Sequence, residues 1–344
     1  MTAAVRTARA RPVRVAVVGA GLMGRWHADA ARRAGARVAA VADTSIDAAR
    51  RLAARHAGAR AFRDADELLR ETEIDALHVC TPVAAHAAAA EKAIERGVDV
   101  LIEKPLTPEA RETERLLALA ARRGVVVCPV HQFIFQSGVR EAKRRLDELG
   151  SLVHVESTFC SAGGAGRAER ELDGIVADIL PHPLAMLQHL APQVAAAARW
   201  DAARPAAGEL RARCSAAGAS ASIFVSMSAR PTVCAMTLAG TAASIHIDMF
   251  HGFAVFEPGG VSRTRKILHP FELSLRRLAA ATGNMGARVL RAEPAYPGLR
   301  ALVTAFYASG EAHDGGPIPA ADIFAVARAR DAILVGAESA KSLV

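Results

Sequence analysis

The stretch VRVAVVGAGLMGRWHADAARR, from Val13 to Arg33, decides the fold. It begins with β-branched apolar residues, passes through three glycines, and continues as an alanine-rich segment with charges at helical spacing. β-Branched residues favour strands and alanine favours helices. The stretch therefore predicts a buried strand, a tight glycine turn, and a helix that starts directly after the turn.

The three glycines, Gly19, Gly21 and Gly24, form the pattern G-x-G-x-x-G. Between a strand and a helix, the first glycine permits the turn and the second lets the backbone approach a pyrophosphate. The third lets the helix pack on the strand, and the helix N-terminus offers free N–H groups to the phosphates. Asp43 ends the next predicted strand, where a carboxylate can bind ribose hydroxyls and repel a 2′-phosphate. The pattern predicts a bound dinucleotide and favours NAD over NADP; the alternative is a glycine turn and a surface aspartate that bind nothing.

The first third of the chain alternates between short apolar runs and alanine-rich helical segments. Apolar strands without polar alternation, separated by helices, indicate a parallel sheet covered on both faces. After about residue 150 the strand-like runs alternate in polarity, which is typical of an open, mostly antiparallel sheet with helices on one side. We therefore predict an α/β Rossmann domain with a doubly wound parallel sheet over residues 1–131. An α+β domain for substrate binding and oligomerisation is expected over residues 132–344, with the last helix packing there or back on the first domain.

Composition excludes several classes of protein. The chain has 344 residues, 51% of them hydrophobic, which is enough for two domain cores. The formal net charge is +8, but the basic residues alternate with acidic ones rather than clustering with aromatics, so we expect no nucleic-acid partner. The five cysteines form no metal-ligand or disulfide pattern, so no metal site and a reducing, cytoplasmic location are expected. No run of about 18 apolar residues exists, so no membrane span is expected.

Two motifs follow later strands of the predicted parallel sheet. Thr81 and Pro82 follow the fourth strand, where threonine can cap the next helix and proline can take its first position. His86 lies in the first turns of that helix, and the simpler interpretation is that it packs within it. Lys104 follows the fifth strand, at the edge where ligands of such sheets bind. It can hold a substrate hydroxyl there; the alternative is a lysine exposed at a strand end.

A third motif, ADILPHPLAMLQHL from Ala177, places Asp178 four residues before His182. Prolines at 181 and 183 predict that the helix starts near His182, which leaves Asp178 in the segment before it. A neutral imidazole can accept the proton of an alcohol that is being oxidised. The alternative is a helix start with a capping aspartate and a packed histidine.

Taken together and in this order, the glycine turn, T-P, E-K-P and D-x-x-x-H resemble the Gfo/Idh/MocA family of oxidoreductases, which includes glucose–fructose oxidoreductase and inositol dehydrogenase. The resemblance covers nearly the whole chain. It implies a catalytic lysine at Lys104 and a catalytic pair at Asp178 and His182. It implies cofactor contacts at Gly19, Gly21, Leu22, Met23, Gly24, Asp43, Thr81, Pro82, His86 and Glu103.

The resemblance also implies an activity. The expected reaction is hydride transfer between NAD and a secondary alcohol or carbonyl of a sugar, polyol or nucleotide sugar. The alternatives are reduction of an imine or unsaturated non-sugar substrate, or a non-catalytic NAD-sensing regulatory role. A homodimer or homotetramer assembled through the open sheet is expected.

The chain departs from the family pattern on the substrate side. Ile134 stands where the family often has an arginine, and Ala185 where it often has an acid. The segment Thr264–Pro294 predicts one interrupted amphipathic helix or two short ones, and the basic stretch from Ser262 to Arg291 is also unusual. A lid, a dimer arm and an anion-collecting surface remain open as its role.

Overall fold

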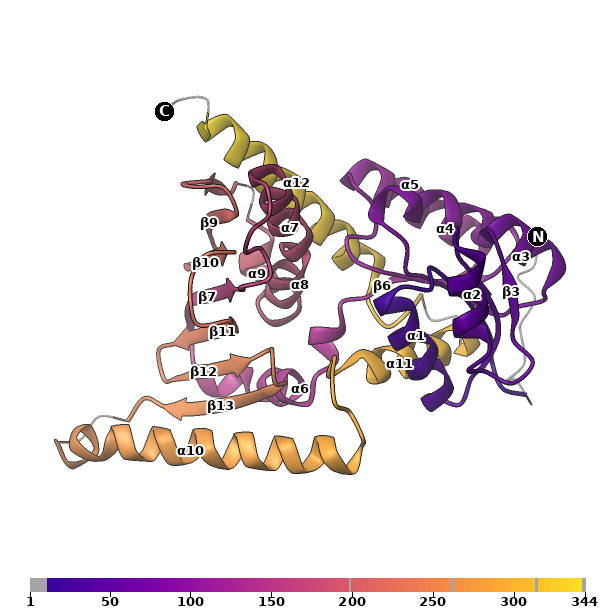
Figure 1. The fold of residues 1–344 in the computed structure, drawn as a ribbon. Coiled ribbons are helices and arrows are strands. Elements are labelled where there is room, and N and C mark those ends of the chain that lie inside the picture. Colours follow the sequence, from indigo (N-terminus) through magenta and orange to yellow (C-terminus); the bar gives the residue numbers. More distant parts are fainter. Residues whose placement is uncertain (1–10, 198, 261–262, 313–314, 342–344) are drawn as a thin grey trace. The chain divides into compact units, whose positions relative to one another are not determined.

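The computed structural model describes residues 11–197, 199–260, 263–312 and 315–341. The chain forms two compact units (Figure 1). The first unit contains residues 1–130 and 299–327, and the second contains residues 131–298 and 328–344.

The first unit is built on a six-stranded parallel sheet with the strand order β3-β2-β1-β4-β5-β6. This doubly wound arrangement confirms the α/β prediction. The strands are β1 (Arg14–Val18), β2 (Arg37–Ala42), β3 (Arg60–Phe62), β4 (Ala76–Val79), β5 (Asp99–Ile102) and β6 (Val127–Pro129). The central position of β1 places the glycine turn at the point where the strand order reverses, beside the end of β4.

Helices cover the parallel sheet because its strands are apolar on both faces. Val15, Ala16 and Val17 of β1 are fully buried. Helix α4 packs along α5, and α1 packs along α11 (Figure 1). The helices of this unit are α1 (Leu22–Arg33), α2 (Ile46–Ala53), α3 (Ala65–Glu71), η1 (Val83–Ala85), α4 (His86–Glu95), α5 (Ala110–Arg123) and α11 (Leu299–Ala312).

At the edge of this sheet opposite the glycine turn, Asp75 links the segments that precede β1 and β4. Asp75 precedes β4 and accepts both guanidinium N–H groups of Arg11, at 2.8 and 3.0 Å, and the backbone N–H of Arg14 at 2.8 Å. Burial tends to raise the pKa of the Asp75 carboxyl, but the hydrogen bonds from Arg11 and Arg14 outweigh it and lower the pKa. Asp75 therefore ties the chain before β1 to the start of β4.

The second unit is built on a seven-stranded sheet with the order β13-β12-β11-β7-β10-β9-β8. Only β7 and β10 pair in parallel, so the sheet is mixed and mostly antiparallel, as expected. The strands are β7 (Leu152–Cys160), β8 (Asp201–Ala203), β9 (Glu209–Ala216), β10 (Ala219–Ser226), β11 (Val233–Gly240), β12 (Ala243–Asp248) and β13 (Phe253–Pro258).

The two faces of this sheet differ in burial because its strands alternate. In β10, Ala221 and Ile223 are buried, whereas Ser222 and Phe224 between and beside them are half-exposed. Helices α6, α7, α8 and α9 lie over the buried face (Figure 1). The helices of this unit are η2 (Gln132–Phe135), α6 (Ser137–Arg144), η3 (Leu146–Leu149), α7 (Glu169–Ile179), α8 (Pro181–Leu190), α9 (Pro192–Ala195) and α10 (Arg263–Leu290).

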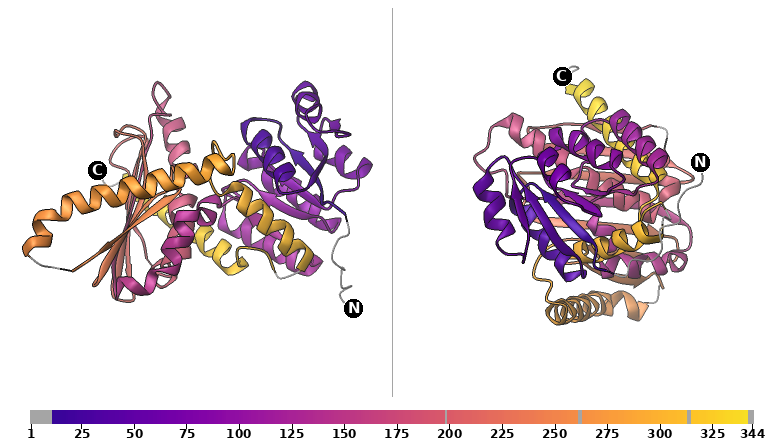
Figure 2. Two further views of the ribbon diagram at one scale, coloured as in Figure 1. Left: turned by 90° about the horizontal axis from the view of Figure 1, so that it is seen from below. Right: turned by 90° about the vertical axis from the view of Figure 1, so that its right-hand side faces the viewer.

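The basic stretch after β13 forms one long helix, α10, rather than two short ones. It lies along β13 at the margin of the sheet (Figures 1 and 2). Glu257 links the two elements, because its carboxylate contacts Nε2 of His269 on α10 and Nε2 of His246 on β12, each at 2.8 Å. The last helix, α12 (Ala320–Lys341), starts in the first unit and ends in the second.

The structure bears on two exclusions made from the sequence. Within the described ranges, no helix is long and apolar enough to cross a membrane. Cys80, Cys128, Cys160, Cys214 and Cys234 are all free thiols.

The contacts of Asp75 predict a pH-dependent contribution to stability. Replacing it in Asp75→Asn should lower the free energy of unfolding by about 2 kcal/mol at neutral pH, because charge-assisted hydrogen bonds to a buried carboxylate are lost. The folded pKa is lowered, so this contribution is complete above the unfolded aspartate pKa of about 4 and is lost as pH falls through the folded pKa. Urea unfolding across this pH range measures it.

Glu73→Gln is the matched control. Glu73 also pairs with Arg14, at 2.7 Å, but its side chain is 87% exposed, and exposed ion pairs contribute little. If both variants lose the same stability, Asp75 has no special role in closing the sheet.

Candidate functional site

The glycine turn contains two glycines that the fold requires and one that it does not. Gly19 has a φ of +97°, and a β-carbon on it would lie 2.5 Å from the carbonyl oxygen of Cys80. A β-carbon on Gly24 would lie 1.8 Å from the carbonyl oxygen of Gly19. By contrast, a β-carbon on Gly21 would meet nothing within 4 Å. The chain's own packing leaves this space open, and it is where the backbone approaches a dinucleotide pyrophosphate in this type of turn.

The start of α1 fits an anion. Gly21 is the N-cap residue and has no side chain to satisfy the free N–H groups, and the first turn contains no acidic residue. Leu22 and Met23 begin the helix, and Leu22 is 57% exposed. The positive end of the helix dipole is therefore not compensated by this helix's own cap or first turn.

Asp43 has a structural role as well as the expected binding role. One carboxylate oxygen accepts the backbone N–H of Ala20 at 2.7 Å, and the other accepts that of Ser45 at 2.8 Å. The carboxylate thus fastens the glycine turn to the end of β2. Each carboxylate oxygen can accept more than one hydrogen bond, so capacity remains for ribose hydroxyls.

The expectation that Thr81 caps the next helix is wrong. Pro82 occupies the N-cap position of η1 and separates Thr81 from the free N–H groups of that helix. The Thr81 hydroxyl oxygen is buried and has no hydrogen-bond partner among the described residues. A buried hydroxyl without a partner is costly.

Both ring nitrogens of His86 lie within hydrogen-bond distance of backbone carbonyl oxygens. Its Nδ1 faces the carbonyl oxygen of Pro105 at 3.0 Å, and its Nε2 faces that of Thr81 at 2.8 Å. The side chain is buried. His86 therefore joins the T-P loop to the E-K-P loop, and any effect on a cofactor acts through those two backbones.

Glu103 is the buried end of a chain of hydrogen bonds that the sequence motifs do not reveal. Its carboxylate contacts Nε2 of His27 at 3.1 Å, and Nδ1 of His27 lies 3.2 Å from Nδ1 of His78. His78 Nε2 lies 3.0 Å from the hydroxyl of Tyr307, on α11. Three elements far apart in sequence therefore support the residue that precedes Lys104.

This chain of hydrogen bonds keeps Glu103 ionised. Burial tends to raise the pKa of Glu103, but the hydrogen bond from His27 and the charges of His27 and Lys104 outweigh it and lower the pKa. Because a carboxylate only accepts, His27 Nε2 must donate to it. The backbone N–H of Lys104 also donates to Glu103, at 3.2 Å. Glu103 thus fixes the backbone from which the Lys104 side chain extends.

Asp178 and His182 belong to the second unit, and the backbone between them is helical. A helix starts at Pro181, as expected, and the segment before it, which contains Asp178, is itself the last turn of α7. Leu180 keeps helical angles between α7 and α8, so Asp178 and His182 lie one helical turn apart on the same side. The ring of His182 packs 4.6 Å from that of Phe133, centroid to centroid.

Arg330 is a neighbour of this pair that no sequence motif predicts. Its Nε donates to the carbonyl oxygen of Ala177 at 3.2 Å. Burial lowers the pKa of the Arg330 guanidinium, whereas the carboxylates of Asp331 and Asp178 act in the opposite direction. Arg330 reaches this position from α12, so only the tertiary fold places a cation beside Asp178.

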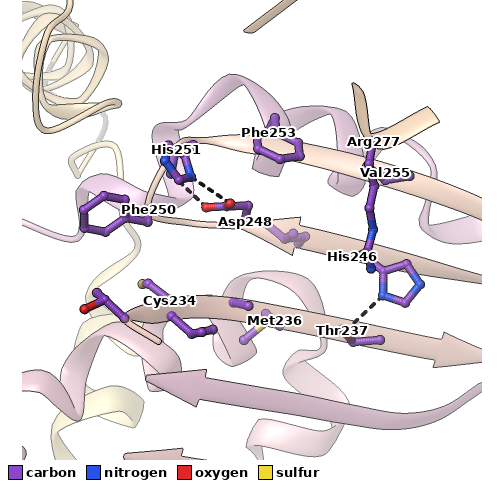
Figure 3. Close-up of a pocket in the computed structure, with 14 residues that line it drawn as sticks. Cys234, Met236, Thr237, His246, Asp248, Phe250, His251, Phe253, Val255 and Arg277 are labelled. Carbon is purple, nitrogen blue, oxygen red and sulfur yellow. Dashed lines mark hydrogen bonds and ion pairs between the residues drawn. The ribbon is translucent and has the colours of Figure 1, made fainter. Parts of the chain in front are cut away.

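The second unit also has a cleft that contains none of the predicted site residues. It has a volume of about 280 Å³ and is lined by residues of β11, β12, β13 and α10 (Figure 3). His251 closes one end, where its Nδ1 contacts Asp248 at 2.8 Å, and Arg277 of α10 lies at the other. No cluster of metal-binding side chains occurs among the residues that the structure describes.

Comparison with known proteins identifies the first unit. Residues 13–131 match the Gfo/Idh/MocA family, described as "Oxidoreductase family, NAD-binding Rossmann fold". A parallel sheet with this turn defines the class, a nucleotide-binding Rossmann protein. Over residues 13–131 the chain therefore carries the NAD-binding Rossmann domain described for the Gfo/Idh/MocA oxidoreductase family.

Curated relatives match over part of their length. The chain is 38% identical over 128 residues to inositol 2-dehydrogenase 4 of Saccharopolyspora erythraea, covering 36% of this chain and 38% of that protein. It is 36% identical over 134 residues to UDP-N-acetylglucosamine 3-dehydrogenase of Acidithiobacillus ferrooxidans, covering 37% and 42%. The chain spans less than half the length of the curated relatives it matches.

Solved structures match over both units. UDP-N-acetylglucosamine 3-dehydrogenase GnnA of Acidithiobacillus ferrooxidans has a TM-score of 0.75 at 22% identity, covering 96% of this chain and 99% of that one. WlbA dehydrogenase of Bordetella pertussis, in complex with NADH and UDP-GlcNAcA, has a TM-score of 0.76 at 17% identity and 97% coverage of both. At these identities the likeness concerns the fold.

The open space at Gly21 predicts a binding defect without a folding defect. Gly21→Ala should leave the melting temperature unchanged within about 2 °C, because the new methyl group meets nothing. It should weaken NAD binding by at least about tenfold, because the methyl group occupies the space of the pyrophosphate. Calorimetric titration with NAD measures the affinity.

Gly283→Ala, at an equally unobstructed glycine of α10, is the matched control and should bind NAD as the parent does. Unchanged affinity in Gly21→Ala would exclude the glycine turn as the pyrophosphate site.

Proposed function

We propose that this chain is an NAD-dependent oxidoreductase. It would transfer a hydride between nicotinamide and a secondary alcohol or carbonyl of a sugar, polyol or nucleotide sugar. The observation that carries the proposal is the arrangement at the end of β1: an open approach at Gly21, a helix start without a cap, and the partnerless hydroxyl of Thr81. The curated relatives named above act on inositol and on a nucleotide sugar, which supports the substrate class.

The cofactor contacts follow from the same arrangement. The backbone at Gly19, Gly21 and Gly24, with the helix start at Leu22 and Met23, would hold the pyrophosphate. Asp43 would bind the ribose hydroxyls, and Thr81 and Pro82 would line the path toward the nicotinamide. His86 and Glu103 would hold the T-P loop and the E-K-P loop in place through hydrogen bonds to their backbones.

Three side chains would take part in the reaction. NAD, when bound, supplies the hydride acceptor. Lys104 would donate a hydrogen bond to the reacting oxygen and stabilise the negative charge that develops on it. His182 would accept the hydroxyl proton, and Asp178 would orient His182 or a neighbouring substrate hydroxyl. In the reverse direction His182 would return the proton to the carbonyl oxygen.

The open face of the seven-stranded sheet supports assembly. Its strands present half-exposed side chains such as Ser222, Phe224 and Thr237. We propose that a second copy covers this face in a homodimer or homotetramer.

Replacing the proposed catalytic lysine tests the reaction. Lys104→Ala should lower turnover by at least about 100-fold, because the developing charge loses its donor. The affinity for NAD should change by no more than a few fold. Reduced nicotinamide absorbance, followed against a panel of polyols, sugars and nucleotide sugars, measures turnover.

Lys92→Ala removes another lysine of the first unit, one that pairs with Asp66, and should turn over normally. Turnover at the parent rate in Lys104→Ala would overturn the assignment. Binding of NAD with no turnover of any panel substrate by the parent would favour the sensing role.

The charge of Asp43 predicts cofactor preference. The parent should use NAD better than NADP, because the carboxylate repels a 2′-phosphate. Asp43→Asn keeps one oxygen, which can accept the Ala20 N–H and so retain the turn, while the hydrogen bond from the Ser45 N–H is lost. The ratio of kcat/KM for NADP to that for NAD should rise by at least about tenfold. A parent that prefers NADP would contradict this interpretation of Asp43.

A further inference from the structure

Helix α10 carries a regular apolar stripe that its own unit does not cover. The stripe, named here the α10 seam, follows alternating steps of three and four residues through Leu268, Phe271, Leu275, Leu278, Thr282, Met285 and Val289. Its six apolar members are between 54% and 73% exposed. Such a row of large apolar side chains on one helix marks an interaction surface.

The opposite side of α10 is attached to its own unit. His269 contacts Glu257 on β13, and Asn284 donates to the carbonyl oxygen of His251 at 2.9 Å. Arg288 donates to the carbonyl oxygens of His251, Glu293 and Pro294 at 2.8 to 3.2 Å. These contacts fix the rotation of the helix, so the α10 seam faces away from the sheet.

The spacing of the seam indicates that its partner is another helix. Alternating steps of three and four give a period of 3.5 residues, the repeat of two helices that wind around each other, whereas a single straight helix has 3.6 residues per turn. The flanking positions are mostly small: Ser274, Ala279, Ala281 and Gly286. Small residues beside the seam allow a second helix to approach closely.

The exposed area matches what a stable dimer needs. A large apolar side chain exposes about 200 Å² when free, so six seam residues exposed by about two-thirds present about 800 Å² per chain. Two copies of the seam together reach the area of about 1,600 Å² that is standard for a stable interface. We propose that the α10 seam pairs with the α10 seam of a second copy of this chain.

Two cations of α10 are engaged away from the seam. Arg276 lies away from the seam and pairs with Glu272 at 2.7 Å, and Arg288 is turned back to carbonyls of its own unit. A membrane-surface helix instead keeps its cations free for lipid headgroups beside its apolar face. The seam consists of α10 residues alone, so pairing through it is a different contact from pairing through the strands of the sheet.

Light scattering after gel filtration of the full chain tests the proposal. In Leu278→Glu a charge enters the middle of the seam, and the molar mass should fall by half. Gly283→Glu adds the same charge at an exposed position outside the seam and should keep the parent mass. Leu275→Glu, one turn from Leu278, should repeat the result, and unchanged melting temperatures would show that all three variants fold.

Three outcomes would overturn the proposal. The first is that the parent chain is monomeric at micromolar concentration. The second is that both Leu278→Glu and Leu275→Glu keep the molar mass of the parent. The third is that the molar mass of Gly283→Glu also falls by half. A separate binding measurement uses vesicles of phosphatidylcholine with phosphatidylglycerol. If the parent binds them and Leu278→Glu does not, while both have one mass, the seam serves a lipid surface and the pairing is refuted.

Discussion

The contact between the start of α1 and the end of β1 is the constraint on which the first unit depends. Helix α1 packs so close to the strand that a β-carbon on Gly24 would lie 1.8 Å from the carbonyl oxygen of Gly19. This close approach aims the N-terminus of α1 along the carboxyl edge of the sheet. Asp43 then fastens the turn to β2 through the Ala20 N–H. Of the three glycines of the turn, Gly21 is therefore the one beside which the chain's own packing leaves open space.

Buried polar groups form hydrogen bonds behind the same edge of the sheet, ending at Glu103. Glu103, His27, His78 and Tyr307 form a continuous chain of hydrogen bonds in a region where an unpaired polar group would be costly. Burial lowers the pKa of His78 and raises that of Tyr307, so both remain neutral at ordinary pH. Glu103 provides the carboxylate among these four hydrogen-bonded residues, and it directly precedes Lys104. This arrangement supports the role proposed for Lys104, because its backbone is anchored to a residue that cannot move without breaking several hydrogen bonds.

The two faces of the sheet in the second unit differ in how far their side chains are buried. Alternation along its strands buries one face under α6 to α9 and leaves the other half-exposed. Helix α10 lies at the margin of the sheet and is attached by polar contacts, so its apolar residues are free to face outward. A helix that packed on the sheet through its apolar side would bury those residues. The polar attachment is therefore what leaves the seam available to another copy.

The sequence by itself determined the architecture and the glycine turn, because both depend on local patterns. Apolar strands, helical spacing and three glycines at fixed positions need no distant partner to be interpreted, and they predicted the parallel sheet and the mostly antiparallel sheet. The sequence misplaced Thr81 as a cap, because it could not show that Pro82 takes the cap position. It also could not show that the segment before His182 is helical and that the backbone stays helical through Leu180. It also left the form of α10 open. Only the tertiary structure decided the support of Glu103 by His78 and Tyr307 and the approach of Arg330 to Asp178, since these contacts join residues that the chain separates by up to 229 positions.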